Sequence, residues 1–314
     1  MAEKTTAPRD ARPSEIGGWR DHAGREEFES AYRVAMAELP PPDRTWDVPT
    51  GSGTVRAYRF APSAGAAGAH DRTPALLLPG WGAAVPMWGT NLPALLEDRP
   101  VYALDALGDA GLSVQTAPLR TADAQAAWID QTLDGLGAGQ VHVVGHSFGG
   151  WSATNLAVRR PDHVASLSLL DPVQTFSRIR WQVVLLSVPS TVPFLPQRWR
   201  DAALARIGGT ERIDPTDPVT AVIAAGTRHY RSHRSFPALF TVDQLRALAV
   251  PVWAAMAGSS AVNADPDAAV SRARENVADV EARVWPGATH SLPFERPEEV
   301  GAALRDFHAR HDPA

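Results

Sequence analysis

The sequence predicts an α/β protein with a mostly parallel, doubly wound sheet. Short apolar runs that indicate buried strands alternate along the chain with segments whose apolar residues have helical spacing. One such run, ALLLPG at residues 75–80, is apolar at successive positions and ends in glycine, as strands covered on both faces often do. Strand, helix and strand repeated at this interval favour one sheet with helices on both sides.

The predicted elements keep this alternation from one end of the chain to the other. An amphipathic helix is expected from Glu26 to Leu39, where PPP ends it, and two strands surround a Gly-Ser-Gly turn within residues 44–62. Later strands are expected in VYAL, VHVV, VASLSLL, VPVWAAMA and VEARVW, and later helices in 87–96, 121–137, 151–160 and 297–308. Residues 26–171 and 250–314 are therefore expected to form the core.

Residues 172–249 break the alternation between two core strands. They contain helical segments around Trp181–Leu186, Trp199–Ile207 and Val219–Tyr230, with many prolines between them. We expect a helical cap inserted into the sheet fold, rather than a second independent domain. Residues 1–25 are polar and lack the apolar centre of an export signal, so a flexible leader and a cytoplasmic location are expected.

Composition excludes several classes of function. A formal charge of −5 gives no reason to expect nucleic acid or an anionic membrane as a partner, and no run approaches the roughly 18 apolar residues of a membrane span. The chain has no cysteine, which removes thiol nucleophiles, disulfides and thiolate zinc sites. Its only lysine is Lys4, so a phosphate-binding Walker loop or an internal Schiff base lacks its residue. No cofactor and no metal are expected.

The strongest chemical signal is the GxSxG sequence at residues 145–149, which follows the strand VHVV and precedes a helix. A serine becomes a useful nucleophile when it projects from a sharp turn at a strand end, where small glycines let the backbone bend. This context predicts Ser147 as the nucleophile. The backbone N–H of Phe148, at the start of the helix, is suited to binding an oxyanion.

With this elbow the chain resembles the α/β-hydrolase superfamily from about residue 45 onward. LLLPGWG is similar to the family's oxyanion turn, with Pro79 where histidine is usual, and the match implies that Trp81 gives the second oxyanion N–H. YALDALGDAGLS resembles the family's glycine-rich loop, which implies a structural capping role for Asp105. PGATHSLPFERPEEV looks like the terminal histidine loop and makes His290 the base. The likeness is greatest to small actinobacterial-type hydrolases and carboxylesterases with a G-D-x-G-x-S loop and a GHS-x-GG elbow.

The third triad residue is ambiguous, because the loop AGSSAVNADPD has Ala261 where the family usually carries an acid. A carboxylate is needed to hold the base in the right tautomer and to stabilise its imidazolium form. Asp171 ends the strand beside the nucleophile strand, as the acid of some relatives does, and is the preferred candidate. Asp265 and Asp267 remain alternatives, although both suit a helix N-terminus, and an enzyme without an acid also remains open.

The other histidines have simpler interpretations. His142 is expected to be buried on its strand, and His146 to pack beneath the serine. The two are four residues apart, but they lie on a strand and a turn without further ligands, so they do not indicate a metal site. His229 and His233 are expected on a solvated helix face, with substrate contact as the alternative.

A serine nucleophile favours acyl transfer over the alkyl-ester chemistry that epoxide hydrolases and dehalogenases perform with a carboxylate. We therefore expect hydrolysis of a carboxylic ester, thioester or lactone of a small apolar substrate. One alternative is a biosynthetic enzyme that uses this machinery for lactone formation, acyl elimination or C–C cleavage. A second is a non-catalytic ligand-binding protein, suggested by the missing acid. The expected pocket is apolar, and its predicted residues are Trp88, Trp181, Phe194 and Tyr230.

Overall fold

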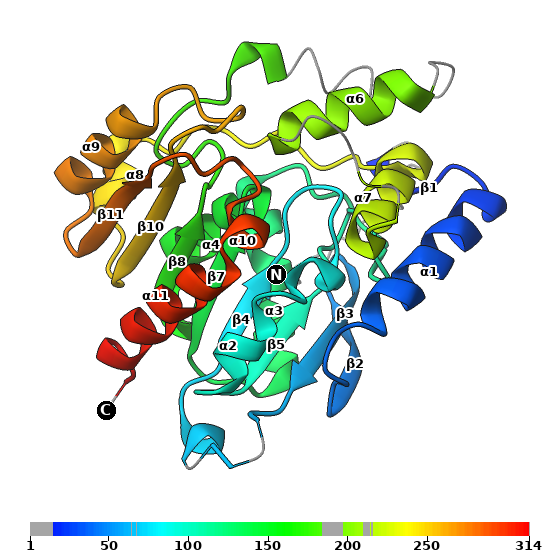
Figure 1. Ribbon diagram of the computed structural model, residues 1–314. Coiled ribbons are helices and arrows are strands. Elements are labelled where there is room, and N and C mark those ends of the chain that lie inside the picture. Colours follow the sequence, from blue (N-terminus) through cyan, green and yellow to red (C-terminus); the bar gives the residue numbers. More distant parts are fainter. Residues whose placement is uncertain are drawn as a thin grey trace, which may run out of the picture.

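A nine-stranded sheet forms the centre of the protein (Figure 1). The computed structural model describes residues 15–63, 65–66, 68–183, 197–209, 214 and 216–313. The strand order is β11-β10-β8-β7-β4-β5-β3-β2, with β6 paired to β3; pairs from β11 to β5 are parallel, and β2, β3 and β6 join antiparallel. The predicted mostly parallel sheet is confirmed. The strands are β2 (Arg44–Thr50), β3 (Gly53–Phe60), β4 (Ala75–Leu78), β5 (Val101–Leu104), β6 (Val114–Gln115), β7 (Val141–His146), β8 (Val164–Leu170), β10 (Val252–Ala257) and β11 (Val280–Trp285).

Helices cover both faces of this sheet, and each face has its own apolar core. In β4, Leu76 and Leu78 join one core while Ala75 and Leu77 join the other, because successive side chains of a strand point to opposite faces. One core includes side chains of α3, α4, α8 and α9, and the second includes those of α1, α2, α7 and α11. The helices are α1 (His22–Met36), α2 (Leu92–Leu96), α3 (Ala122–Leu136), α4 (Phe148–Arg159), α6 (Gln197–Gly208), α7 (Pro218–His229), α8 (Val242–Arg246), α9 (Pro266–Asn276), α10 (Leu292–Glu295) and α11 (Pro297–Arg310), with short 3-10 turns η2 (Ala69–Asp71), η3 (Val85–Trp88) and η4 (Pro161–His163).

The N-terminal boundary differs from the prediction. A flexible leader was expected through residue 25, but α1 begins at His22 and residues 18–19 form β1 (Gly18–Trp19), which pairs antiparallel with β9 (Tyr230–Arg231). The Trp19 ring lies 4.7 Å from that of Phe28 and 5.1 Å from that of Tyr230. These aromatic contacts give residues 15–25 packing partners that a polar composition does not reveal. Residues 1–14 lie outside the described residues.

The region expected to be a cap contains the predicted helices α6 and α7, and α6 lies above one end of the sheet in Figure 1. The third predicted segment begins with helical residues 181–183, and its remainder lies outside the described residues. Helix α7 packs against α1 rather than standing apart (Figure 1). Of the helices in the described ranges, none is long and apolar enough to cross a bilayer.

Candidate active site

The turn between β7 and α4 holds Ser147 in a strained conformation. Its φ of 55° and ψ of −117° are unusual for a residue with a side chain, and such strain concentrates at functional sites. The flanking glycines permit the turn: a Cβ on Gly149 would collide with the carbonyl oxygen of Leu78, and one on Gly145 would lie 2.6 Å from the backbone nitrogen of Gly150. The turn thereby places the serine at the carboxyl end of β7, as the motif predicts.

Three of the predicted residues form a continuous chain of hydrogen bonds at this end of the sheet. His290 Nε2 lies 2.9 Å from Ser147 Oγ, and His290 Nδ1 lies 2.6 Å from Asp171 Oδ2. Ser147 comes from the β7–α4 turn, Asp171 follows β8, and His290 lies between β11 and α10. The ring of His290 therefore bridges a hydroxyl and a carboxylate, with Asp171 fully buried and Ser147 and His290 only 9% and 7% exposed.

The loop that lacks the usual acid binds Asp171 instead. Ser260 Oγ donates to Asp171 Oδ2 at 2.7 Å, Asn263 Nδ2 donates to Oδ1 at 2.8 Å, and the N–H of Ala257 donates to Oδ1 at 3.1 Å. Burial raises the pKa of the Asp171 carboxyl, but the hydrogen bonds from His290, Ser260 and Asn263 outweigh it, so the net pKa lies below the ordinary value. Asp171 is thus held as a carboxylate beside the imidazole.

Neither alternative acid reaches the histidine loop. Asp265 is exposed and caps α9, where its Oδ1 accepts the N–H of Ala268 at 2.9 Å. Asp267 is exposed in the first turn of the same helix. The sequence reasoning that preferred Asp171 did not find Ser260 and Asn263. The signal was present, since two small polar donors stand on either side of Ala261.

The two expected oxyanion donors lie on either side of the serine. A Cβ placed on Gly80 would be 3.4 Å from Ser147 Cβ, so the turn that carries Trp81 runs directly beside Ser147. The rings of Trp81 and Phe148 meet edge to face at 5.2 Å. Within the part of the chain that the structure describes, the N–H groups of these two residues have no hydrogen-bond acceptor. Both are available to a developing negative charge.

Asp105 has the structural role expected from the glycine-rich loop. It is fully buried, and its side chain accepts hydrogen bonds from the N–H groups of Val85 and Leu112 and from the hydroxyl of Tyr32, at 2.8–3.2 Å. Burial raises the pKa of this carboxyl to about 6 despite those hydrogen bonds. Asp105 therefore ties the start of η3 and the loop after β5 to α1.

The remaining histidines are held by the fold. His146 is buried, its Nε2 lies 2.8 Å from the carbonyl oxygen of His290, and burial together with His290 lowers its pKa to about 3. A neutral ring that donates from Nε2 therefore supports the histidine loop. His142, at the opposite end of β7, lies 2.8 Å from Ser166 Oγ and 3.0 Å from Asp312 Oδ1. Contrary to the expected solvated face, His229 is mostly buried beside Glu27 of α1.

The predicted pocket residues do not gather at one place. Trp88 is fully buried in the core beneath α1 and α2, which contradicts its expected place in an open pocket. Trp181 is 67% exposed, so it does not line an enclosed pocket either, and Phe194 lies outside the described residues. Tyr230 does line a cavity of about 250 Å³, together with Trp81 and Gly82 of the oxyanion turn.

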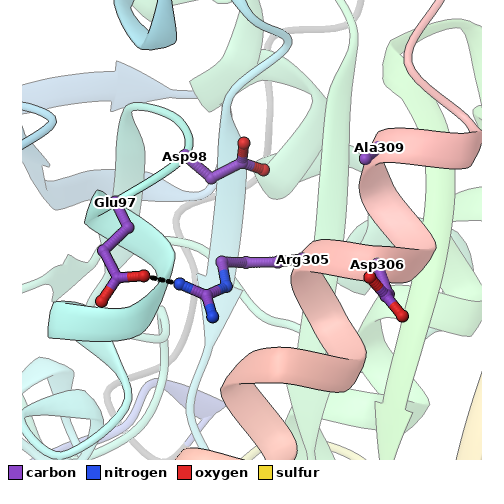
Figure 2. A pocket seen from close by; sticks show the side chains of 5 residues that line it. All are labelled: Glu97, Asp98, Arg305, Asp306 and Ala309. Carbon is purple, nitrogen blue, oxygen red and sulfur yellow. Dashed lines mark ion pairs between the residues drawn. The ribbon is translucent and has the colours of Figure 1, made fainter. Parts of the chain in front are cut away.

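A second cavity, of about 300 Å³, lies far from the triad between α11 and the loop after α2. Figure 2 shows its lining and the ion pair between Glu97 and Arg305. Asp98, also in this lining, precedes the amino end of β5, so the cavity lies toward the end of the sheet opposite to Ser147. Among the described residues, no group of three or more His, Asp or Glu side chains is placed to bind a metal ion.

A mostly parallel sheet with a serine on a strained turn, a histidine after the last strand and a buried aspartate between them defines the α/β-hydrolase class. The chain matches the alpha/beta hydrolase family over residues 75–303 and belongs to it.

Among its relatives is the uncharacterized carboxylesterase nap of Bacillus subtilis, 28% identical over 248 residues that cover 77% of this chain and 81% of that protein. Lipase LipV of Mycobacterium tuberculosis is 33% identical over 224 residues, covering 67% and 84%. The crystal structure of carboxylesterase CesB (YbfK) from Bacillus subtilis superposes with a TM-score of 0.82 at 24% identity, covering 91% of this chain and 98% of that one. The naproxen esterase structure from the same species gives a TM-score of 0.81 at 24% identity, covering 92% and 99%.

Proposed function

We propose that this protein is a serine hydrolase that cleaves a carboxylic ester through an acyl-enzyme intermediate. The observation that carries the proposal is the chain from Asp171 through His290 to Ser147, with contacts of 2.6 and 2.9 Å. Carboxylesterases among the relatives support ester hydrolysis in general. Beyond ester hydrolysis, we propose that this chain uses a serine triad and acts on a small apolar substrate.

In the proposed mechanism His290 removes the proton of Ser147 as the hydroxyl attacks the ester carbonyl. The N–H groups of Trp81 and Phe148 stabilise the oxyanion of the tetrahedral intermediate, and His290 then protonates the leaving alcohol. The same imidazole activates water to release the acid. Asp171 stabilises the imidazolium in both steps, and its own supports keep it ionised.

The lack of an acid at residue 261 suggests a non-catalytic binding protein as an alternative. The contacts of Ser260 and Asn263 with Asp171 argue against that alternative, because the loop holds a carboxylate from another strand in place of an acid of its own. Thioesters and lactones use the same attack machinery and remain within the proposed activity.

The proposal is tested with a fluorophosphonate probe and a panel of esters, thioesters and lactones. The wild type is expected to be labelled and to turn over at least one ester, while Ser147→Ala loses both. Ser166→Ala is the matched control, because Ser166 also contacts a histidine but lies within regular β8; it should be labelled like the wild type. Labelling that persists in Ser147→Ala would reject the assignment.

A further inference from the structure

A buried ion pair connects the oxyanion turn with the region between β8 and β10. Asp109, in the loop after β5, accepts the N–H of Gly82 at 3.0 Å through Oδ2, and the same oxygen accepts Arg234 Nη2 at 2.6 Å. Its other oxygen accepts the N–H of Ala110 at 2.8 Å. The Arg234 and Asp109 side chains are 1% and 3% exposed. The residue after Trp81 is thus fixed to a carboxylate that an arginine neutralises.

The guanidinium of Arg234 also contacts both residues that carry the expected oxyanion donors. Its central carbon lies 4.2 Å from the ring centroid of Phe148 and 5.2 Å from that of Trp81. A cation over an aromatic face is attracted by the ring quadrupole, and the attraction strengthens where water is excluded. One side chain therefore reaches the oxyanion turn by a ring contact and through Asp109, and reaches the elbow through Phe148.

Burying the Arg234–Asp109 pair costs free energy, because both charges lose their hydration. Both side chains are removed from water, and this burial lowers the pKa of Arg234 and raises that of Asp109. Apolar residues of similar volume often give equal or greater stability than a buried ion pair. The Arg234 guanidinium, with one hydrogen bond to Asp109 and contacts to two aromatic rings, instead specifies the orientation of these groups.

Neighbouring contacts hold Arg234 against the core. Ser232 Oγ donates to the carbonyl oxygen of Gly108 at 2.7 Å, and Ser235 Oγ donates to that of Arg120. The backbone of Arg234 is therefore anchored on both sides. The position of its guanidinium depends on how residues 230–235 sit on the loop after β5.

We propose that Arg234, acting with Asp109, is a positioning residue that aligns the Trp81 and Phe148 N–H groups for the oxyanion. This inference rests on the proposed esterase function. It makes residues 230–235 a determinant of transition-state stabilisation, in addition to any contact with substrate. Losing one oxyanion donor outright costs about 10²–10³ in kcat. Misalignment without loss of a donor is expected to cost less.

The test compares Arg234→Met with Arg99→Met. Arg99 is also fully buried and ion-paired, with Asp98 and Asp312, but lies at the amino end of the sheet. With a short-chain p-nitrophenyl ester, Arg234→Met should lower kcat about 10- to 100-fold and leave KM within threefold. A trifluoromethyl ketone inhibitor, which mimics the tetrahedral intermediate, should bind more weakly by the same factor as the loss in kcat. Arg234→Lys, which keeps the charge but loses the planar contact with the rings, should fall between. Arg99→Met should lower thermal stability and leave kcat within threefold.

Amide hydrogen exchange gives a readout that does not depend on turnover. Arg234→Met and Asp109→Asn should each speed exchange at the Gly82 amide at least tenfold, with no such change in Arg99→Met. Unchanged protection at Gly82, or a kcat loss that Arg99→Met matches, would overturn the inference. A wild type without turnover would reject the proposed function, whereas the exchange measurement would still decide whether Arg234 holds the turn.

Discussion

Each end of the central sheet contains a histidine whose two ring nitrogens contact a serine and an aspartate. The surroundings of only one of these sets are suited to catalysis. At the carboxyl end, Asp171, His290 and Ser147 are joined by contacts of 2.6 and 2.9 Å. At the amino end, Asp312, His142 and Ser166 are joined by contacts of 3.0 and 2.8 Å. Distances alone do not separate the two sets.

The backbone and the surroundings separate them. Ser147 has a positive φ and lies beside two backbone N–H groups without acceptors in the described chain, whereas Ser166 lies within regular β8 and is fully buried. Asp312 also binds Arg99, and burial lowers the pKa of His142 to about 4. The amino-end set therefore lacks a serine on a strained turn at the end of a strand. A triad is recognised by these additional groups.

The largest expected difference between the ends is in the acids. Asp171→Asn should lower kcat by about 10³–10⁴, because an amide holds the wrong tautomer of His290 and cannot stabilise its imidazolium. Asp312→Asn should change kcat less than threefold and act on stability. Steady-state kinetics on folded protein distinguish the two. A kcat loss in Asp171→Asn as small as that in Asp312→Asn would mean that Asp171 is merely a structural turn residue.

A smaller effect is expected from the hydroxyl groups that support each histidine set. Ser260→Ala removes a 2.7 Å donor to the Asp171 carboxylate, and hydrogen bonds to charged groups contribute roughly 1.5–3 kcal/mol, so kcat should fall about 10- to 100-fold. Its counterpart is Ser168→Ala, whose hydroxyl lies 3.1 Å from His308 Nε2. This variant should keep kcat within twofold, and the same kinetic assay measures both. An unaffected kcat in Ser260→Ala would separate the loop from catalysis.

The third difference leaves kcat unchanged and is a pH dependence of stability that the amino end contributes. The rings of His142 and His308 stack at 4.5 Å, and burial lowers the pKa of His142 to about 4 and that of His308 well below its usual range. In the unfolded chain both histidines have the ordinary pKa of about 6.5 and take up protons at a higher pH than in the folded protein. The free energy of unfolding therefore falls as the pH drops below about 6.5. The part due to His142 reaches roughly 3 kcal/mol near pH 4.

Urea unfolding between pH 7.5 and pH 4.5 measures this dependence. The double variant His142→Gln/His308→Gln should show a shallower fall in unfolding free energy than the wild type. The exposed His22 provides the control, and His22→Gln should leave the slope unchanged. Parallel curves for the double variant and the wild type would contradict the assignment.

Much of this comparison follows from sequence, but not all of it. The parallel sheet, the elbow at Ser147 and the histidine loop were predicted, because strand periodicity and tight-turn chemistry are local properties. The pocket residues were poorly predicted: Trp88 is a core residue and Trp181 faces solvent. An aromatic side chain has the same letter whether it packs a core or lines a cavity, and only the neighbouring elements decide between them.

By itself, therefore, the sequence determined the fold class and singled out Ser147 and His290 as the candidate nucleophile and base. The tertiary structure decided which carboxylate meets the base, because Asp171 and His290 are 119 residues apart and meet only where β8, β10 and β11 lie side by side. It also decided what the loop with Ala261 does, since Ser260 and Asn263 bind a carboxylate that another strand provides. Arg234 is linked to the oxyanion turn through Asp109, which lies 125 residues away in the sequence, and no local pattern in the sequence predicts this contact. Contacts between distant segments depend on strand order and packing, which no short stretch of sequence specifies.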